Sequence, residues 1–133
     1  MSGKVVHFEI PADDGERANN FYTQAFGWTM MPVPGMDYTM VGTTPSSETG
    51  SPLEPGSING GMFVRSEEFP PKSPIITVDV EDIDAALAKI GELGGSTVSP
   101  KTAVGEMGFA AYFKDTEGNI MGLWENGPQP EGQ

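Results

Sequence analysis

The sequence predicts an α+β fold in which one domain of 133 residues contains two βαβββ modules. Three observations predict it. Short β-branched and apolar runs have the character of strands, apolar residues recur at helical spacing, and the order strand then helix returns in the second half of the chain. A chain of this length is expected to form one core. We therefore expect a single domain over residues 1–125, with modules at about 4–65 and 74–125.

The first module is predicted to begin with a strand, KVVHFEI at residues 4–10, and PADD follows it with a turn and a helix-starting carboxylate. The spacing predicts a helix over 14–26 that stops at Gly27. Its apolar face is expected to carry Ala18, Phe21, Tyr22, Ala25 and Phe26. Three strands are expected next, WTMMPV, DYTMVGT and INGGMFVR. The segment 43–57 between the last two is rich in Ser, Thr, Pro and Gly and is predicted to be a loop.

The second module repeats this plan with a strand at 74–80, PIITVDV, and a helix within EDIDAALAKIGELGG. STVSPKTAV, MGFAAYFK and NIMGLWE are expected as its remaining strands. DTEGN at 115–119 is predicted to form a tight turn between the last two of them. The segment 126–133, NGPQPEGQ, is expected to be a flexible tail.

The charge of the chain narrows its possible partners. Seven Lys plus Arg against nineteen Asp plus Glu give a net charge of −12, which repels nucleic-acid backbones and anionic lipid surfaces. No apolar run approaches the roughly 18 residues needed to span a bilayer, and MSGKVVHFEIPADD lacks the apolar centre of a signal peptide. We therefore expect a cytoplasmic protein with no nucleic-acid or membrane partner. The absence of cysteine excludes disulfides and thiolate chemistry.

His7 is the single histidine, and strand alternation places it on one face with Glu9 while Phe8 and Ile10 face the other way. An imidazole and a carboxylate that point into the same cavity can perform general acid–base chemistry, so His7 and Glu9 are the candidate catalytic residues. The alternative is structural. In that interpretation His7 is hydrogen-bonded in a half-polar sheet and Glu9 ends a solvated strand.

Glycines interrupt two of the predicted strands, at Gly60 and Gly61 in SINGGMFV and at Gly122 in GNIMGLWE. A glycine inside a strand often marks a bulge or a close approach to the backbone. Four larger side chains are candidates either for lining an apolar pocket or for core packing, namely Tyr38, Met40, Met62 and Trp124.

Two segments, VHFEIPADDGERANNFYTQAFGW at the front and FKDTEGNIMGLWE at the back, resemble the vicinal oxygen chelate superfamily, which includes glyoxalase, extradiol dioxygenases and bleomycin-resistance proteins. The resemblance covers about 4–125. It implies that the modules form a curved mixed sheet with a concave ligand cavity and that the chain pairs as a homodimer. In metal-bearing members, four side chains from the first and last strands of both modules hold a divalent ion. Carried onto this sequence, the four positions fall on His7, Gly60, Ser73 or Pro74, and Gly122.

Two of those positions are glycines, which have no side chain to coordinate a metal, and serine is a weak ligand. The resemblance therefore implies a glyoxalase- or bleomycin-resistance-like protein that binds a small, largely apolar molecule without a metal or other cofactor. The ligand-binding residues are expected to be Gly60, Met62, Ser73, Gly122 and Trp124. The alternative is a glyoxalase-like lyase or isomerase that uses His7 and Glu9, with a divalent metal if an acid such as Glu9 supplies the missing ligand.

Overall fold

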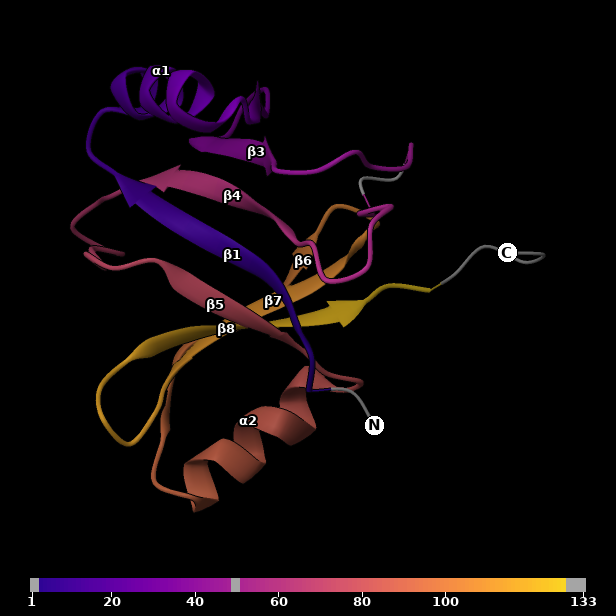
Figure 1. Ribbon diagram of the computed structural model, residues 1–133. Coiled ribbons are helices and arrows are strands. Elements are labelled where there is room, and N and C mark those ends of the chain that lie inside the picture. Colours follow the sequence, from indigo (N-terminus) through magenta and orange to yellow (C-terminus); the bar gives the residue numbers. More distant parts are fainter. Residues whose placement is uncertain (1–2, 49–50, 129–133) are drawn as a thin grey trace. The chain divides into compact units, whose positions relative to one another are not determined.

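A computed structural model describes residues 3–48 and 51–128, and within them the chain forms two helices and eight strands (Figure 1). Strand, helix and three strands follow one another twice, which confirms the predicted α+β class with two βαβββ modules. Contacts within the chain divide it into two units. The first unit is His7–Ile75, and the second contains Ile76 onwards together with the start of the chain through Val6.

The first unit holds a four-stranded mixed sheet. Its elements are β1 (Val5–Ala12), α1 (Gly15–Phe26), β2 (Thr29–Pro32), β3 (Tyr38–Gly42) and β4 (Asn59–Val64). The strands lie in the order β2-β3-β4-β1, with β1 and β4 parallel and the other neighbours antiparallel. β1 runs two residues beyond the predicted strand because Pro11 and Ala12 still pair with Phe63 and Val64 of β4.

Helix α1 begins and ends as the sequence predicts. The Asp14 side chain accepts a hydrogen bond from the Arg17 backbone N–H at 3.0 Å, and Gly27 ends the helix with a φ of 71°. α1 lies over one face of its sheet (Figure 1), where Ala18 packs against the core. That core contains Ala12, Val41 and Met62, with Phe8, Ile10, Trp28 and Met30 packed around it. α1 and this core cover one face of the sheet, and the opposite face is not covered by α1.

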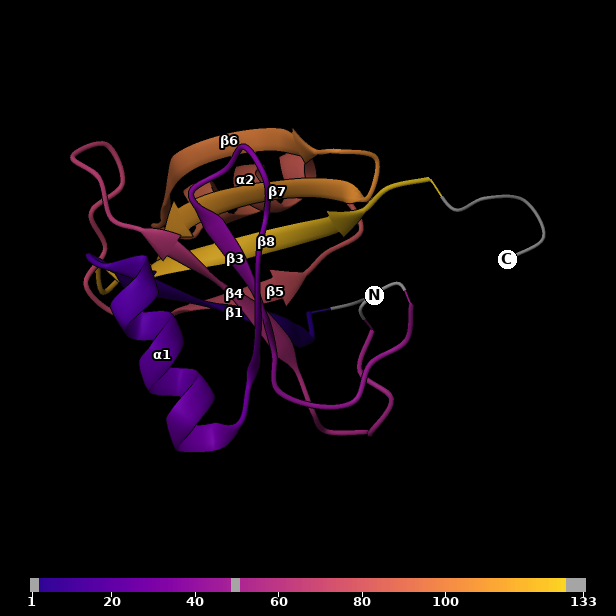
Figure 2. The same cartoon turned by 90° about the horizontal axis from the view of Figure 1, so that it is seen from above.

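The second unit repeats the arrangement. Its elements are β5 (Ile75–Asp79), α2 (Ile83–Glu92), β6 (Ser96–Val104), β7 (Gly108–Lys114) and β8 (Ile120–Asn126). The order is β5-β8-β7-β6, and β5 and β8 form its parallel pair. Figure 2 shows β6, β7 and β8 side by side with α2 behind them. Buried Ile83 of α2 packs on Ala111 and Leu123, so this unit also has one face covered by its own helix.

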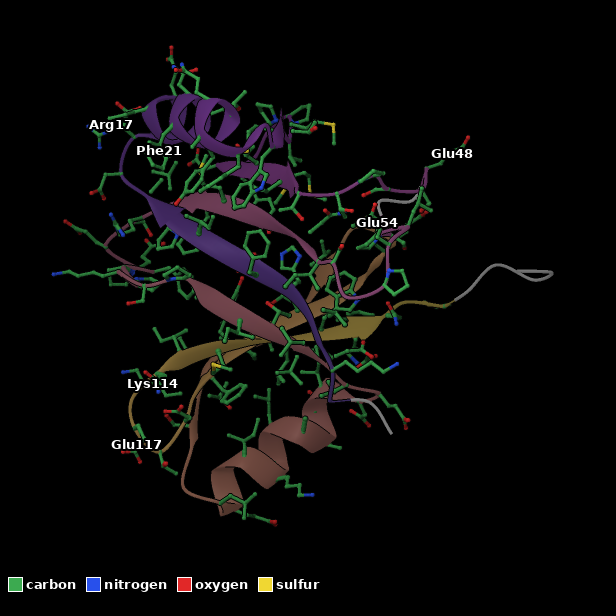
Figure 3. All side chains as sticks on the ribbon, in the orientation of Figure 1. Arg17, Phe21, Glu48, Glu54, Lys114 and Glu117 are labelled. Carbon is green, nitrogen blue, oxygen red and sulfur yellow. The ribbon has the colours of Figure 1, made fainter. Side chains whose placement is uncertain are left out.

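The predicted tight turn at 115–119 is confirmed, and one aspartate organises it. Asp115 Oδ1 accepts from the backbone N–H groups of Glu117 and Asn119 at 2.8 and 2.9 Å, and Oδ2 accepts from the Asn119 side chain at 2.9 Å. These hydrogen bonds, that of the Asn119 side chain above all, lower the pKa of the Asp115 carboxyl. Figure 3 shows Lys114 and Glu117 projecting from this hairpin end.

The end of the chain differs in part from the predicted flexible tail at 126–133. β8 extends to Asn126, and the buried Gly127 donates its backbone N–H to the Met107 carbonyl at 2.9 Å. The rest of that tail, from 129, lies outside the described residues. No helix in residues 3–48 and 51–128 is both long enough and apolar enough to cross a bilayer.

Candidate functional site

Three polar side chains meet on the face of the first unit's sheet that α1 leaves uncovered. The Tyr38 hydroxyl donates to Glu9 Oε2 at 2.7 Å and lies 3.0 Å from His7 Nε2. His7 Nε2 and Glu9 Oε2 are 3.8 Å apart, which is beyond hydrogen-bond range. The structure therefore brings together the predicted pair, His7 and Glu9, through Tyr38, which the sequence had suggested only for lining an apolar pocket or for core packing.

Strand pairing explains how these three side chains converge. His7 and Glu9 alternate onto one face of β1, and the parallel neighbour β4 places Gly61 directly beside Glu9. On the other side of β4, antiparallel β3 places Met40 beside Gly61. Tyr38 lies two residues before Met40 on the same face, so its long side chain can reach across Gly61 toward β1.

Gly61 provides the space that Tyr38 occupies. A Cβ atom at position 61 would overlap the Tyr38 hydroxyl and ring atoms. The backbone at Gly61 does not have the positive φ that favours glycine, so space and not backbone conformation requires glycine here. Of the two explanations for a glycine inside a strand, a bulge or a close approach, Gly61 therefore shows the close approach.

Burial distinguishes Glu9 from the other two members of the group, since His7 and Tyr38 are both partly exposed. Glu9 is 6% exposed, whereas the His7 side chain is 28% exposed. A buried carboxyl group needs hydrogen-bond partners, and Tyr38 supplies one. Met40, which is partly exposed, and Phe63 lie on the same face. A molecule on this face would therefore meet the partly exposed His7 and Tyr38 side chains and Met40, whereas Glu9 is buried.

Two residues of the predicted ligand site lie on the opposite face. Met62 is 3% exposed and belongs to the core under α1. Gly60 also faces α1, and a Cβ atom there would lie 2.6 Å from the Phe8 ring. The position that the family resemblance placed on Gly60 was thus one residue out of register in β4, and Gly61 is the glycine on the His7 face.

Gly122 and Trp124 share the face of the second unit that lies away from α2. Gly122 pairs with Thr77 of β5 and with Tyr112 of β7, and a Cβ atom on it would lie 2.7 Å from Thr77 Oγ1. The Trp124 indole N–H donates to Asn126 Oδ1 at 2.9 Å. Their part in ligand binding stays a prediction.

Ser73 is exposed and precedes β5, so it does not occupy the position equivalent to His7. When the helix N-caps Asp14 and Asp82 are aligned, His7 corresponds to Ile75 and Glu9 corresponds to Thr77. Ile75 is an apolar residue that is 1% exposed. The second module therefore offers no imidazole or carboxylate at the place where the first carries His7.

The side chains present do not fit a divalent metal of the type that the family resemblance implies. Such a site takes at least three protein ligands. Within the described part of the chain, no group of three or more His, Asp or Glu side chains lies close enough to hold an ion. In addition, His7 Nε2 contacts the Tyr38 hydroxyl, which fills the space over Gly61.

Two surface hollows of about 340 and 650 Å³ lie elsewhere, at the start of α1 and the end of β4. Both are lined by Asp13 and Arg65, which form a two-pronged ion pair at 2.8 and 3.0 Å. The hydrogen bond from Arg65 lowers the pKa of Asp13. The cations lining these hollows are balanced by neighbouring carboxylates, and neither hollow includes His7, Glu9 or Tyr38. We therefore place the candidate site on the His7 face.

Comparison with known proteins shows the family to which this chain belongs. The sequence pattern described as bleomycin resistance protein-like N-terminal matches residues 4–44. A glyoxylase-like domain-containing protein of Didymella fabae is 31% identical over 126 residues, which cover 92% of this chain and 94% of that protein. The chain therefore belongs to the glyoxalase-like proteins of the vicinal oxygen chelate superfamily.

More distant proteins agree with this assignment. CFP32 of Mycobacterium tuberculosis, which is named as a glyoxylase, is 30% identical over 126 residues, and this chain covers 43% of its length. Methylmalonyl-CoA epimerase from Mycobacterium tuberculosis has the same fold, with a TM-score of 0.64, 16% identity and coverage of 95% of this chain and 89% of that one. The protein BH1468 of Bacillus halodurans matches with a TM-score of 0.63 and 16% identity over 98% of this chain and 99% of its own. At these identities the solved structures show the fold alone.

Proposed function

We propose that this glyoxalase-like protein binds a small, largely apolar molecule without a metal, and that the molecule contacts the His7 face of the first unit. The observation that carries the proposal is the Tyr38 hydroxyl, which contacts both His7 Nε2 and Glu9 Oε2 and so occupies Nε2 of the single imidazole. Met40, which is 37% exposed, supplies apolar contact area on that face. The net charge of −12 opposes an anionic ligand and a nucleic-acid partner.

The residues on this face divide into contacting and supporting groups. His7 is a partly exposed polar group that the ligand would meet, and Glu9 and the partly exposed Tyr38 hold it in place. Met62 and Gly60 face the core and have no part in this site. The roles of Gly122, Trp124 and Ser73 in ligand binding stay predictions from the sequence.

Metal analysis and a binding screen test the proposal together. Protein prepared without a histidine tag and without added metal should contain no stoichiometric transition metal. In a thermal-shift screen of small uncharged molecules, a ligand at 100 times its Kd should stabilise the native protein by about 2.7 kcal/mol. His7→Ala should reduce that shift. About one metal ion per chain that is lost in His7→Ala would refute the metal-free proposal.

The hydrogen bonds that link His7, Tyr38 and Glu9 in a row favour a second function. A partly exposed imidazole supported by a hydroxyl and a buried carboxyl group is suited to proton transfer, so a lyase or isomerase is the alternative. Hydrogen exchange distinguishes the two functions. A catalyst should move solvent deuterium into an activated carbon of the bound molecule, and His7→Ala should abolish the exchange, whereas a binding protein should leave the molecule unlabelled.

We also propose that the chain forms a homodimer. The support, apart from the family resemblance, is a group of large apolar side chains on the first unit that are more than half exposed. They are Phe21, Phe26, Met31, Met36 and Leu53. Sedimentation at micromolar concentration should show a species of twice the 14.1 kDa chain mass, and a species of 14.1 kDa alone would refute the proposal.

A further inference from the structure

We infer that Gly61 and Tyr38 together fix the proton of the His7 imidazole on Nε2, so that the Nδ1 lone pair faces the ligand and selects uncharged molecules with a hydrogen-bond donor. The part that concerns the ligand rests on the proposed binding function. The part that concerns the imidazole can be tested on the protein alone.

The number of protons in the group leads to this assignment. A tyrosine hydroxyl has one hydrogen, and Tyr38 donates it to Glu9 Oε2 at 2.7 Å. The hydrogen in the 3.0 Å contact between Tyr38 Oη and His7 Nε2 must then come from Nε2. A neutral imidazole carries one N–H, so Nδ1 of His7 holds the lone pair. No hydrogen bond within the described part of the chain uses Nδ1 of His7.

This lone pair, on a side chain that is 28% exposed, defines the class of ligand that we infer. It accepts a hydrogen bond from an O–H or N–H group, and it offers nothing to a molecule that only accepts. The charge of the chain disfavours anions, and the exposed Met40 favours a partly apolar molecule. The site therefore suits uncharged phenols, alcohols or amides better than ethers or hydrocarbons of the same shape.

Gly61 acts through Tyr38 and is a positioning residue. It has no side chain that could touch a ligand, but any side chain there would overlap the Tyr38 hydroxyl. Displacing the hydroxyl would remove the group that orders His7 Nε2 and Glu9 Oε2. The absence of a side chain at position 61 thus determines which nitrogen of the His7 imidazole offers its lone pair to the ligand.

His7 is the only histidine of the chain, so the imidazole nitrogens of the untagged protein give signals from one ring. In a ¹H–¹⁵N long-range correlation spectrum of the neutral ring, the wild type should show the pattern of the Nε2–H tautomer. Tyr38→Phe and Gly61→Ala should each change it to a mixture of tautomers. Tyr22→Phe is the matched control and should leave it unchanged, because Tyr22 stacks on Trp28 with ring centroids 5.1 Å apart and is no part of the group. An Nδ1–H tautomer in the wild type, or a pattern that Tyr38→Phe leaves unchanged, would overturn the assignment.

Phenol and anisole then test the class of ligand, because they differ by the O–H donor. Phenol should shift the Nδ1 resonance of the wild type, anisole at the same concentration should not, and the response to phenol should be smaller in Tyr38→Phe. Equal shifts with both probes, or none with either, would overturn the inferred selectivity. The thermal-shift screen separates this result from the proposed function, since a stabilising ligand without a donor would leave the binding function standing and refute only the inference.

Discussion

Replacing Gly61 by alanine tests the packing that brings the candidate site together. The new Cβ would occupy the place of the Tyr38 hydroxyl, so the tyrosine must move and Glu9 loses one hydrogen-bond donor. Loss of a hydrogen bond to a buried carboxylate destabilises a protein by about 1.5–3 kcal/mol. Overpacking adds about 1–3 kcal/mol. Alanine also lowers the conformational entropy of the unfolded chain, which offsets about 0.4–1 kcal/mol of this loss of stability. We therefore expect Gly61→Ala to lower the free energy of unfolding by about 2–5 kcal/mol, out of the roughly 5–15 kcal/mol typical of a domain.

Urea unfolding of a double-mutant cycle measures the effect and identifies its cause. In a Tyr38→Ala background the ring is gone, so adding Gly61→Ala should change the unfolding free energy by less than about 1 kcal/mol, and the difference is the coupling between the two residues. Gly91→Ala is the control for the glycine replacement itself, because a Cβ atom there meets open space on an exposed part of α2. It should stabilise the protein by up to about 1 kcal/mol. An equal cost of Gly61→Ala in both backgrounds would refute the proposed packing.

Three further changes have expected outcomes. Tyr38→Phe should lower the free energy of unfolding by about 1–3 kcal/mol, because buried Glu9 loses a donor, whereas Tyr22→Phe should change it little in the same urea titration. The folded-state pKa of Asp115 is lowered, so its carboxylate stabilises the folded state above the unfolded pKa, and this contribution is lost as pH falls through the folded pKa. The melting temperature of Asp115→Ala should therefore lie below that of the wild type at about pH 7. The difference between the two melting temperatures should disappear in acid. Gly122→Ala should destabilise the protein by about 1–3 kcal/mol, because its Cβ would lie 2.7 Å from Thr77 Oγ1, and the loss should shrink in a Thr77→Ala background.

The sequence predicted local features of this fold well, since each depends on neighbouring residues. The alternation of β1 correctly placed His7 and Glu9 on one face, and the apolar spacing with Gly27 correctly bounded α1. The turn at Asp115 followed in the same way from five adjacent residues. Side-chain alternation in strands and apolar periodicity in helices are both properties of short segments.

The errors at the site concern residues that meet across strands. A shift of one residue in strand register moves every side chain to the opposite face, and the order of apolar residues in β4 does not reveal its register against β1. Gly60 and Met62 were therefore assigned to the His7 face, although Gly61 lies there. Tyr38 is 31 residues from His7 in the chain, and only the pairing of β3, β4 and β1 brings its hydroxyl to the imidazole.

Comparison of the two modules explains why glycine recurs in β4 and β8. Gly61 lies beside Glu9 in the first unit, and Gly122 lies beside Thr77 at the corresponding place in the second. In both cases the missing Cβ leaves room for a polar oxygen on the face away from the helix, that of Tyr38 at Gly61 and that of Thr77 at Gly122. The modules thus share a backbone arrangement but differ in chemistry. The carboxyl group and the imidazole occur at these positions only in the first, so acid–base or hydrogen-bond selection by the protein must depend on His7 and its support rather than on the repeated sheet.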